Sequence, residues 1–270
     1  MKKSVKILMI AAALILLSVF AIWVLWANTA LESNQFTLTE SNLPAAFDGF
    51  RIAHISDLHS AEMGQGNAKL IGMLKQMQPD MIVITGDMMD CRDTETDVAL
   101  SFAREAVKIA PCYYVTGNHE VRLPSYLYSQ LLDGLSVAGV TVLMDEAVQL
   151  TRGEHSITIV GQAWGDADVS MNADVDEYSI LLAHTPEFFD LYAEAGYDLV
   201  FCGHFHGGQF RIPFLGGLYT PSQGLFPEYD AGHYGKGNTD MIVSRGIGNS
   251  TFPLRFNNRP EVILVELKSA

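Results

Sequence analysis

The sequence predicts an α/β fold in which two β-sheets pack together with helices on their outer faces, preceded by one N-terminal transmembrane helix. Short runs rich in branched apolar residues, typical of buried strands, recur along the 270 residues. Early runs alternate with stretches of helical periodicity, whereas later runs follow one another with few helices between them, as expected for two packed sheets. The first 27 residues stand apart because they hold a long apolar segment without charge.

Residues 7–27 form the predicted transmembrane segment. These 21 positions include Ser18 as the only polar residue, and about 20 apolar residues suffice to cross a bilayer core. Three lysines lie in residues 1–6 and no acidic residue occurs before Glu32. By the positive-inside rule, residues 1–6 stay in the cytoplasm and the rest lies on the extracytoplasmic side of the cell membrane, held by a single pass. A cleaved signal peptide is the alternative, but the apolar run exceeds the usual h-region and no Ala-x-Ala site follows Trp26.

Residues 28–49 are expected to be a short linker with a first strand near Phe36, and residues 50–270 to form one catalytic domain. Three stretches have the apolar spacing of helices, and proline ends the first two at Pro79 and Pro111. The predicted helices cover residues 68–78, 98–109 and 124–138. The predicted strands cover residues 50–56, 81–85, 113–116, 140–144, 156–160, 180–183, 199–202, 241–244 and 262–267.

Residues 216–237 differ from the rest because they contain six glycines among four aromatic residues. A long irregular loop is expected there, and long loops in compact domains are usually functional or disordered. The loop is expected either to form an ordered wall of a substrate site or to pack over the sheet.

The charge after residue 27 is strongly acidic. That region has 14 basic and 31 acidic residues, a formal charge of −17. Such a surface repels nucleic-acid backbones, so no nucleic-acid partner is expected. The three cysteines form no C-x-x-C pair, which disfavours a structural zinc site.

Short motifs of Asp, Asn and His end several of the apolar runs. The motifs are Asp57-Leu58-His59, Gly86-Asp87, Gly117-Asn118-His119-Glu120, His184-Thr185-Pro186 and Gly203-His204-Phe205-His206. Strands that all finish in such residues direct hard and borderline ligands to one edge of a sheet, an arrangement that suits two divalent ions. Asp57 and His59 are two residues apart, so in an extended segment both side chains reach one side. The sequence therefore predicts a dinuclear metal hydrolase.

In order and spacing, these motifs resemble the calcineurin-like metallophosphoesterases, over about residues 50–266. The Gly207-Gly208-Gln209 segment and the segments at 244–250 and 257–261 resemble the membrane-anchored bacterial phosphodiesterase branch. The resemblance implies a four-layer α/β/β/α sandwich and a calcineurin-like phosphoesterase domain at residues 50–270. It also implies that Asp57, His59, Asp87 and His206 hold a first metal, and that Asp87 bridges to a second, which Asn118, His184 and His204 complete.

His119 is the predicted general acid, since it follows the ligand Asn118 and stands outside the ligand set. Glu120 is expected either to orient that imidazole or to be a solvated carboxylate. Asp90 completes the Gly-Asp-x-x-Asp element and is expected to lie behind the ligands. His54 is expected to be a core residue. Arg245 and Arg259 can grip a phosphate or pair with acidic residues, and both are left outside the predicted site.

The predicted function is hydrolysis of a phosphodiester or phosphoanhydride by in-line attack of metal-bound hydroxide, on a membrane-proximal or lipid-linked substrate. A phosphomonoesterase acting on soluble extracellular esters is the alternative, and an inactive metal-stabilised binding module is a third. The His-x-His-x-Asp-His motif of metallo-β-lactamases is absent. The mixed nitrogen and oxygen ligands suit manganese, iron, zinc or cobalt. Metal identity, diester preference and oligomeric state stay open.

Overall fold

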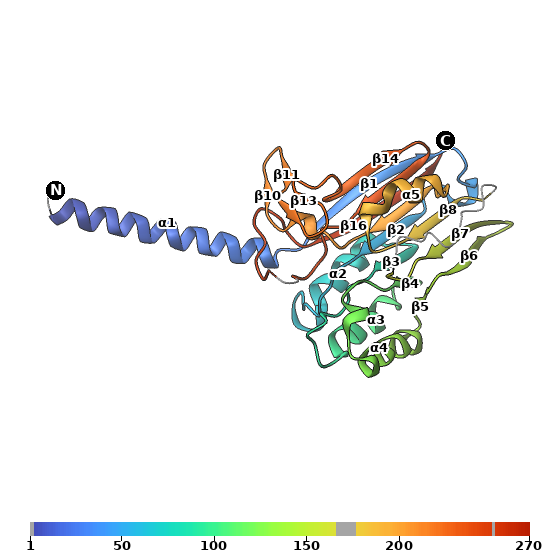
Figure 1. Ribbon diagram of the computed structural model, residues 1–270, viewed down its shortest axis with the longest axis horizontal. Coiled ribbons are helices and arrows are strands. Elements are labelled where there is room, and N and C mark those ends of the chain that lie inside the picture. The colour runs from blue at the N-terminus through green and yellow to red at the C-terminus, as the bar shows by residue number, and fades with distance from the viewer. Residues whose placement is uncertain (1–2, 166–176, 250–251) are drawn as a thin grey trace.

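Two six-stranded sheets packed face to face form the centre of the molecule (Figure 1). The computed structural model describes residues 3–165, 177–249 and 252–270. Helices cover the outer face of each sheet, so the layers follow the predicted order α/β/β/α, with one long helix projecting at the N-terminus. The predicted fold class is confirmed.

The first sheet contains mainly parallel strands. In spatial order its strands are β1 (Glu32–Glu40), β16 (Glu261–Ser269), β2 (Arg51–Ile55), β3 (Met81–Thr85), β4 (Cys112–Val115) and β5 (Thr141–Val142). Strands β2 to β5 are parallel, and β16 runs antiparallel to β2 and parallel to β1. Residues 28–49 therefore contribute a full edge strand to this sheet.

The second sheet has a parallel centre and antiparallel edges. Its strands, in spatial order, are β14 (Gly232–Lys236), β15 (Thr239–Val243), β9 (Leu199–Cys202), β8 (Ser179–Leu182), β7 (His155–Gly161) and β6 (Glu146–Arg152). Strands β15, β9, β8 and β7 are parallel, whereas β14 and β6 each form an antiparallel pair with a neighbour.

The core lies in three layers because strand side chains alternate between the two faces of each sheet. In the first sheet, Ile52 and Val83 pack against the second sheet, whereas Ala53 and Ile82 pack against helices. Helices α2 (Ala68–Met77), α3 (Asp97–Ala106) and α4 (Ser125–Ala138) cover the first sheet, and α5 (Phe189–Glu194) covers the second. Both faces of the central strands are buried, which explains their nearly continuous apolar sequences.

Helix α1 (Lys3–Thr29) contains the predicted transmembrane segment. It is the one helix in the described part of the chain that is long and apolar enough to cross a membrane. Most of its length projects away from the sandwich, and only its C-terminal end meets the domain (Figure 1).

Most element boundaries agree with the sequence prediction to within two residues, and the end of α3 differs by three. Strand β6 was not predicted, because it is a polar edge strand whose side chains are largely exposed. The expected irregular loop at 216–237 is instead folded into short hairpins. They are built from β10 (Arg211–Ile212), β11 (Gly216–Gly217), β12 (Tyr219–Thr220), β13 (Gly224–Leu225) and β14.

Candidate active site

The seven predicted ligand residues all follow the carboxyl ends of parallel strands. Asp57 and His59 follow β2, Asp87 follows β3, Asn118 follows β4, His184 follows β8, and His204 and His206 follow β9. Both sheets therefore deliver side chains to the same edge of the sandwich. Six of the seven side chains lie within reach of one another, as the distances below show, and all but the partly exposed His204 are buried.

Five of these residues have a left-handed backbone. The φ angles are 51° at Asp57, 45° at His59, 52° at Asp87, 72° at His204 and 46° at His206. A residue with a Cβ atom adopts this conformation at a cost of roughly 1–2 kcal/mol. Strained backbone of this kind is typical of functional sites, where the surrounding structure holds it in place. Strands β2, β3 and β9 thus end in sharp turns that direct their polar side chains into the site.

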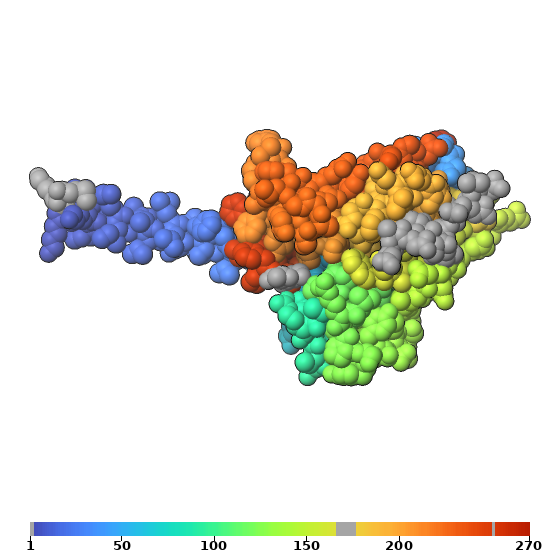
Figure 2. Space-filling view, viewed as in Figure 1, coloured from blue at the N-terminus to red at the C-terminus, as the bar shows by residue number. Residues whose placement is uncertain are grey.

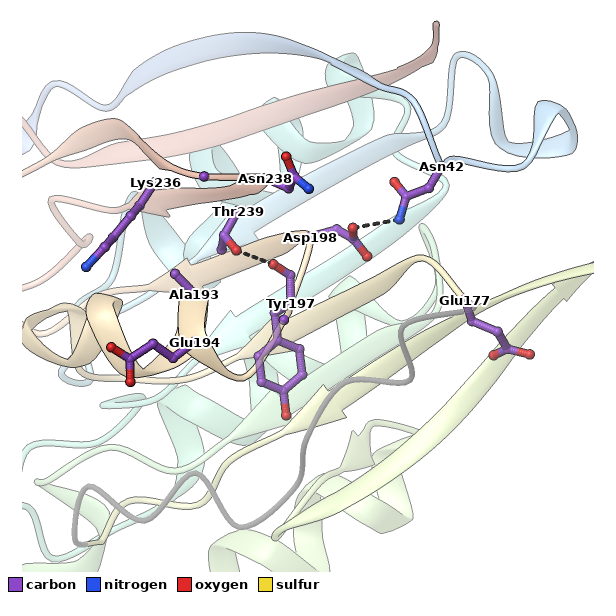
Figure 3. A pocket seen from close by; sticks show the side chains of 11 residues that line it. Asn42, Glu177, Ala193, Glu194, Tyr197, Asp198, Lys236, Asn238 and Thr239 are labelled. Carbon is purple, nitrogen blue, oxygen red and sulfur yellow. Dashed lines mark hydrogen bonds between the residues drawn. The ribbon is translucent and has the colours of Figure 1, made fainter.

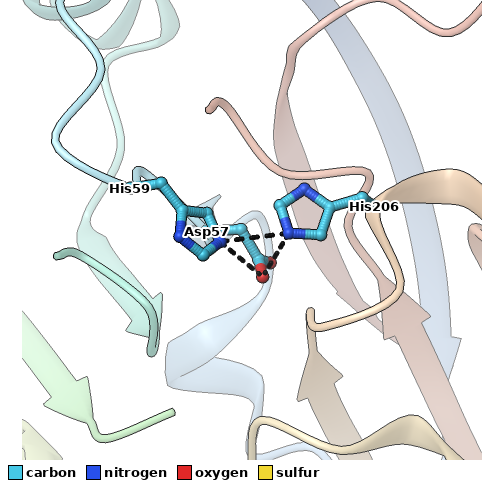
Figure 4. Close-up of side chains that lie close together, drawn as sticks. All are labelled: Asp57, His59 and His206. Atoms are coloured by element: carbon cyan, nitrogen blue, oxygen red, sulfur yellow. Dashed lines mark hydrogen bonds and ion pairs between the residues drawn. The ribbon is translucent and has the colours of Figure 1, made fainter. Parts of the chain in front are cut away.

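Asp57, His59 and His206 form the first group (Figure 4). Nε2 of His206 lies 3.4 Å from Oδ1 of Asp57, and Nε2 of His59 lies 3.8 Å from the same oxygen. The two Nε2 atoms are 3.1 Å apart. Three ligand atoms from β2 and β9 therefore converge on one point, as three ligands of a single cation do.

Asp87, His184 and His204 form the second group. Nε2 of His184 lies 3.3 Å from Oδ2 of Asp87 and 3.2 Å from Nδ1 of His204. The same Asp87 oxygen lies 3.6 Å from Nε2 of His59 in the first group. The Asp87 carboxylate thus stands between the two groups, where a bridging ligand between two cations stands.

The donor set fits divalent ions. It combines two carboxylates with four imidazoles, the mixture that first-row transition metals accept. In the described part of the chain, Oδ1 of Asn118 is buried and has no hydrogen-bond partner, which is costly unless the oxygen binds something else. A cation beside Asn118 would satisfy that oxygen.

The protonation states favour cation binding at three of these residues and oppose it at His184. Burial opposes charge on both carboxyls, but His206 and His59 hold the pKa of Asp57 well below its usual range, and His184 lowers that of Asp87. Burial lowers the pKa of His206 to about 3, so this ring is neutral and keeps one nitrogen lone pair free for a cation. Burial also opposes charge on His184, yet Asp87 raises its pKa to about 10. A cation bound at His184 must therefore displace a proton.

The structure fixes the tautomer of the predicted general acid. The backbone N–H of Cys91 donates to Nδ1 of His119 at 3.0 Å, so the neutral ring carries its proton on Nε2. Burial lowers the pKa of His119, although Asp87 beside it has the opposite effect. Burial thus favours the neutral ring, which offers an N–H donor at Nε2.

Glu120 is neither a solvated carboxylate nor the group that orients the His119 imidazole. Its carboxylate is fully buried and accepts the backbone N–H groups of Asp87, Gly117 and Met89 at 2.8, 2.8 and 3.1 Å. Burial raises the pKa of Glu120 to about 7, because charge is unfavourable there. The expected surface carboxylate is instead a brace that ties the loop after β3 to the loop after β4.

Asp90 lies behind the ligands, as expected. Its Oδ2 is 3.8 Å from Nδ1 of His59 and 3.7 Å from Nδ1 of His119, and Arg92 pairs with it at 2.6 Å. At these separations Asp90 acts on both rings through its charge, because Nδ1 of His59 has no hydrogen-bond partner in the described part of the chain. His54 is a core residue with Nε2 bonded to Thr85 at 2.8 Å.

Two glycines allow the strand ends to approach each other. Gly86 has φ of 85°, and a Cβ atom there would lie 2.7 Å from Nδ1 of His184. A Cβ atom on Gly203 would overlap the side chains of Ser56 and Asp57. Only glycine fits at these two positions without moving a ligand.

Two residues beside the site were not predicted. The Trp164 ring packs against the rings of His184 and His204, at 5.5 and 5.3 Å between centroids. Arg255 is fully buried with its guanidinium 3.1 Å from Nδ1 of His206. The sequence offers only weak signals for them: Trp164 is the only tryptophan after residue 27, and Arg255 stands between Leu254 and Phe256.

Arg245 and Arg259 have structural partners, in agreement with their exclusion from the predicted site. Arg245 pairs with Glu261 at 2.7 Å. Arg259 stacks over the ring of Trp26 and donates to backbone oxygens of residues 30 and 31.

A cavity of about 530 Å³ lies at the opposite ends of β9 and β15 (Figure 3). Its polar groups bond to one another. Asn42 donates to Asp198 at 2.7 Å, and the Thr239 hydroxyl donates to the backbone oxygen of Tyr197 at 2.6 Å. None of the predicted ligands lines this cavity.

Comparisons with known proteins agree with this geometry. The family described as calcineurin-like phosphoesterase matches residues 50–208. The chain is similar to the uncharacterized metallophosphoesterase YkuE of Bacillus subtilis, with 30% identity over 88% of this chain and 86% of the relative. It is also similar to phosphodiesterase YaeI of Escherichia coli, with 28% identity over 81% and 82% of the two chains.

Among solved structures, the protein TT1561 of Thermus thermophilus aligns with a TM-score of 0.50 and 13% identity, over 74% of this chain and 90% of that one. This likeness supports the sandwich fold. The family match covers more than half of the chain, including every strand end that carries a predicted ligand. The chain belongs to the calcineurin-like phosphoesterase family.

Proposed function

We propose that the protein hydrolyses phosphodiester or phosphoanhydride bonds with the help of two divalent ions, held by Asp57, His59, Asp87, Asn118, His184, His204 and His206. The observation that carries this proposal is the position of Asp87, whose Oδ2 lies 3.6 Å from His59 and 3.3 Å from His184. One carboxylate oxygen placed between two groups of donors is suited to hold two cations close together. Such ions supply Lewis-acid activation of water and neutralise phosphoryl oxygens.

The protein's own groups have separate tasks around that centre. His119, with its proton on Nε2, donates to the leaving-group oxygen and stabilises the charge that develops on it. Glu120 and Asp90 hold the ligand loops and rings in place. Trp164 covers the His184 and His204 rings and limits the approach of water from that side.

The donor set supports manganese, iron, zinc or cobalt. The relative named as a phosphodiesterase favours a diester over a monoester. We further propose that α1 anchors the protein in the cell membrane, with residues 1–6 in the cytoplasm and the catalytic domain outside. Strand β1 starts at Glu32, three residues after α1 ends at Thr29, so the domain stays close to the membrane and to lipid-linked substrates.

The test uses full-length protein purified in detergent, with metal content measured by mass spectrometry. Turnover is then compared on a chromogenic diester and the matching monoester, before and after chelation and metal replacement. The proposal requires loss of diester hydrolysis on chelation and its return with one of the four metals. Faster hydrolysis of the monoester would favour the phosphomonoesterase, and metal binding without turnover on either ester would favour the binding module.

A further inference from the structure

An aromatic cluster joins the outer end of α1 to two loops of the catalytic domain. The Phe256 ring lies 5.0 Å from that of Trp23 and 6.4 Å from that of Phe20, both on α1. Phe256 also stacks on Phe210 at 6.2 Å, and Phe210 lies 5.3 Å from Phe252. The loops that carry these residues are therefore fixed against the side of α1.

The ring contacts of Phe256 lie on the membrane side of the point where α1 would leave a bilayer. A helix that enters the membrane at residue 7 needs about 20 residues to cross a core of about 30 Å, which places the outer boundary near Trp26. At about 1.5 Å per residue, Trp23 is roughly 5 Å and Phe20 roughly 9 Å on the membrane side of that boundary. Phe256 packs on both rings, so its loop lies at the depth of the outer leaflet.

The neighbouring hairpins expose large apolar side chains. Phe214 is fully exposed in the turn between β10 and β11, and Leu215, Leu225, Phe226 and Phe252 are each at least half exposed. Phe214 and Phe226 also have φ angles of 69° and 55°, where a bulky residue is strained. Exposure to water disfavours these apolar side chains, so they are placed to meet an apolar partner.

The charge of this surface suits a membrane. Residues 208–227 include a single charged residue, Arg211, in a chain with 18% charged residues. Arg211 pairs with Asp230 at 3.1 Å. The acidic residues that would repel anionic lipid are thus absent from these hairpins.

The hairpins lie at the end of the domain that meets α1. Figure 1 shows β10, β11 and β13 near the outer end of α1, and Figure 2 shows this region projecting upward at that end of the domain. Helix α4 lies on the far side of the first sheet. The exposed apolar groups therefore gather where the membrane surface meets the domain.

We propose that residues 210–226 and 252–256 form a second membrane contact, which sinks into the outer leaflet beside α1. The occupant of this surface is the lipid bilayer at the boundary between headgroups and acyl chains. Arg255 links the contact to the catalytic site, since its guanidinium lies beside His206 and its backbone exchanges hydrogen bonds with Asn28 at 2.7 and 3.0 Å. The metal ligands are thereby held next to lipid headgroups. The inference depends on α1 crossing a membrane and not on the reaction proposed above.

The test places a fluorescent label on Phe214→Cys in full-length protein with Cys91→Ser, because the other two cysteines are buried. Val137→Cys on α4 is the matched control, being a highly exposed apolar residue on the opposite side. The proteins are reconstituted in phosphatidylethanolamine and phosphatidylglycerol vesicles. Quenching by lipids with a nitroxide high on the acyl chain is compared with quenching by aqueous iodide.

We expect the label at 214 to be quenched by the nitroxide lipid and protected from iodide, with the reverse at 137. Quenching of both labels by iodide alone would overturn the proposal. Protection of the label at 214 from both quenchers would show that another protein chain covers this surface, and would also overturn it.

A second variant tests the consequence for catalysis. Phe214→Asp is expected to slow hydrolysis of a diester embedded in vesicles while leaving hydrolysis of a soluble diester unchanged. Equal losses on both substrates would show that the hairpin serves the fold and not the membrane. Because the quenching readout needs no turnover, failure of the proposed reaction is distinguishable from failure of this inference.

Discussion

Replacing Glu120 tests whether its carboxylate stabilises the loops of the site or takes part in catalysis. Glu120→Ala leaves the buried N–H groups of Asp87, Met89 and Gly117 without an acceptor. At about 1–3 kcal/mol each, three unsatisfied amides reduce the free energy of unfolding by roughly 3–9 kcal/mol. The variant also removes a buried charge, and this burial raises the pKa of Glu120 from 4.5 to about 7. Above pH 7, removing that charge offsets the loss of stability by about 3 kcal/mol. A net loss of about 3 kcal/mol lowers Tm by about 6–12 °C.

Glu120→Gln is expected to be much milder. One oxygen of Glu120 accepts two of the three N–H groups, and the other accepts only that of Met89. A glutamine with its oxygen at the position that accepts two N–H groups leaves only the Met89 amide without an acceptor. The cost is about 1–3 kcal/mol, and the loss of the buried charge offsets it. Metal affinity should follow the same order, falling by about 10–100-fold in the alanine variant, the usual effect of losing a group that orients ligands.

Thermal unfolding and metal titration of the full-length protein in detergent measure both effects. Glu105→Ala serves as the control, because Glu105 is a partly exposed residue on α3 that pairs with Lys108. If glutamine proves as damaging as alanine, the negative charge of Glu120 matters more than its hydrogen bonds. If neither variant changes Tm or metal affinity, the brace has no structural role.

Two further outcomes follow from the same geometry. His119→Ala should keep its metal content and lose turnover by about 10²–10⁴, with a smaller loss on nitrophenyl esters; equal losses on good and poor leaving groups would remove His119 from the leaving-group oxygen. Glu40→Gln tests pH dependence, because burial and Asp240 raise the pKa of Glu40 to about 7. A raised carboxyl pKa destabilises the folded state as pH rises from about 4.5 to 7, so the variant should gain stability over wild type at pH 8 and not at pH 4.5. A pH-independent difference in Tm would contradict this assignment.

The central strands were predictable because both of their faces are buried. Met81–Thr85 and Leu199–Cys202 read as continuous apolar runs, and the structure has the same boundaries. Edge strands gave weaker signals. The side chains of β6 are largely exposed, and its position is set by its antiparallel pairing with β7, which periodicity alone does not reveal.

The candidate ligands were predictable because each follows a strand end in a recognisable motif. The residues that support these ligands were not predictable. Glu120 looks like a surface carboxylate in sequence, and only the fold shows that three amides of neighbouring loops surround it. Arg255 and Trp164 reach the site from distant segments, which no local pattern indicates. The tautomer of His119 likewise depends on a backbone N–H that a separate loop supplies.

The most direct test of the account is the number of metal ions bound per chain in wild-type protein and in Asp87→Asn, measured together with diester turnover. Asp133→Asn, an exposed position on α4, is the matched control. The account predicts two ions and full activity in the wild type and control, and fewer ions with no turnover in Asp87→Asn, because a neutral amide bridges two dications poorly. Two ions and undiminished turnover in Asp87→Asn would contradict the dinuclear site.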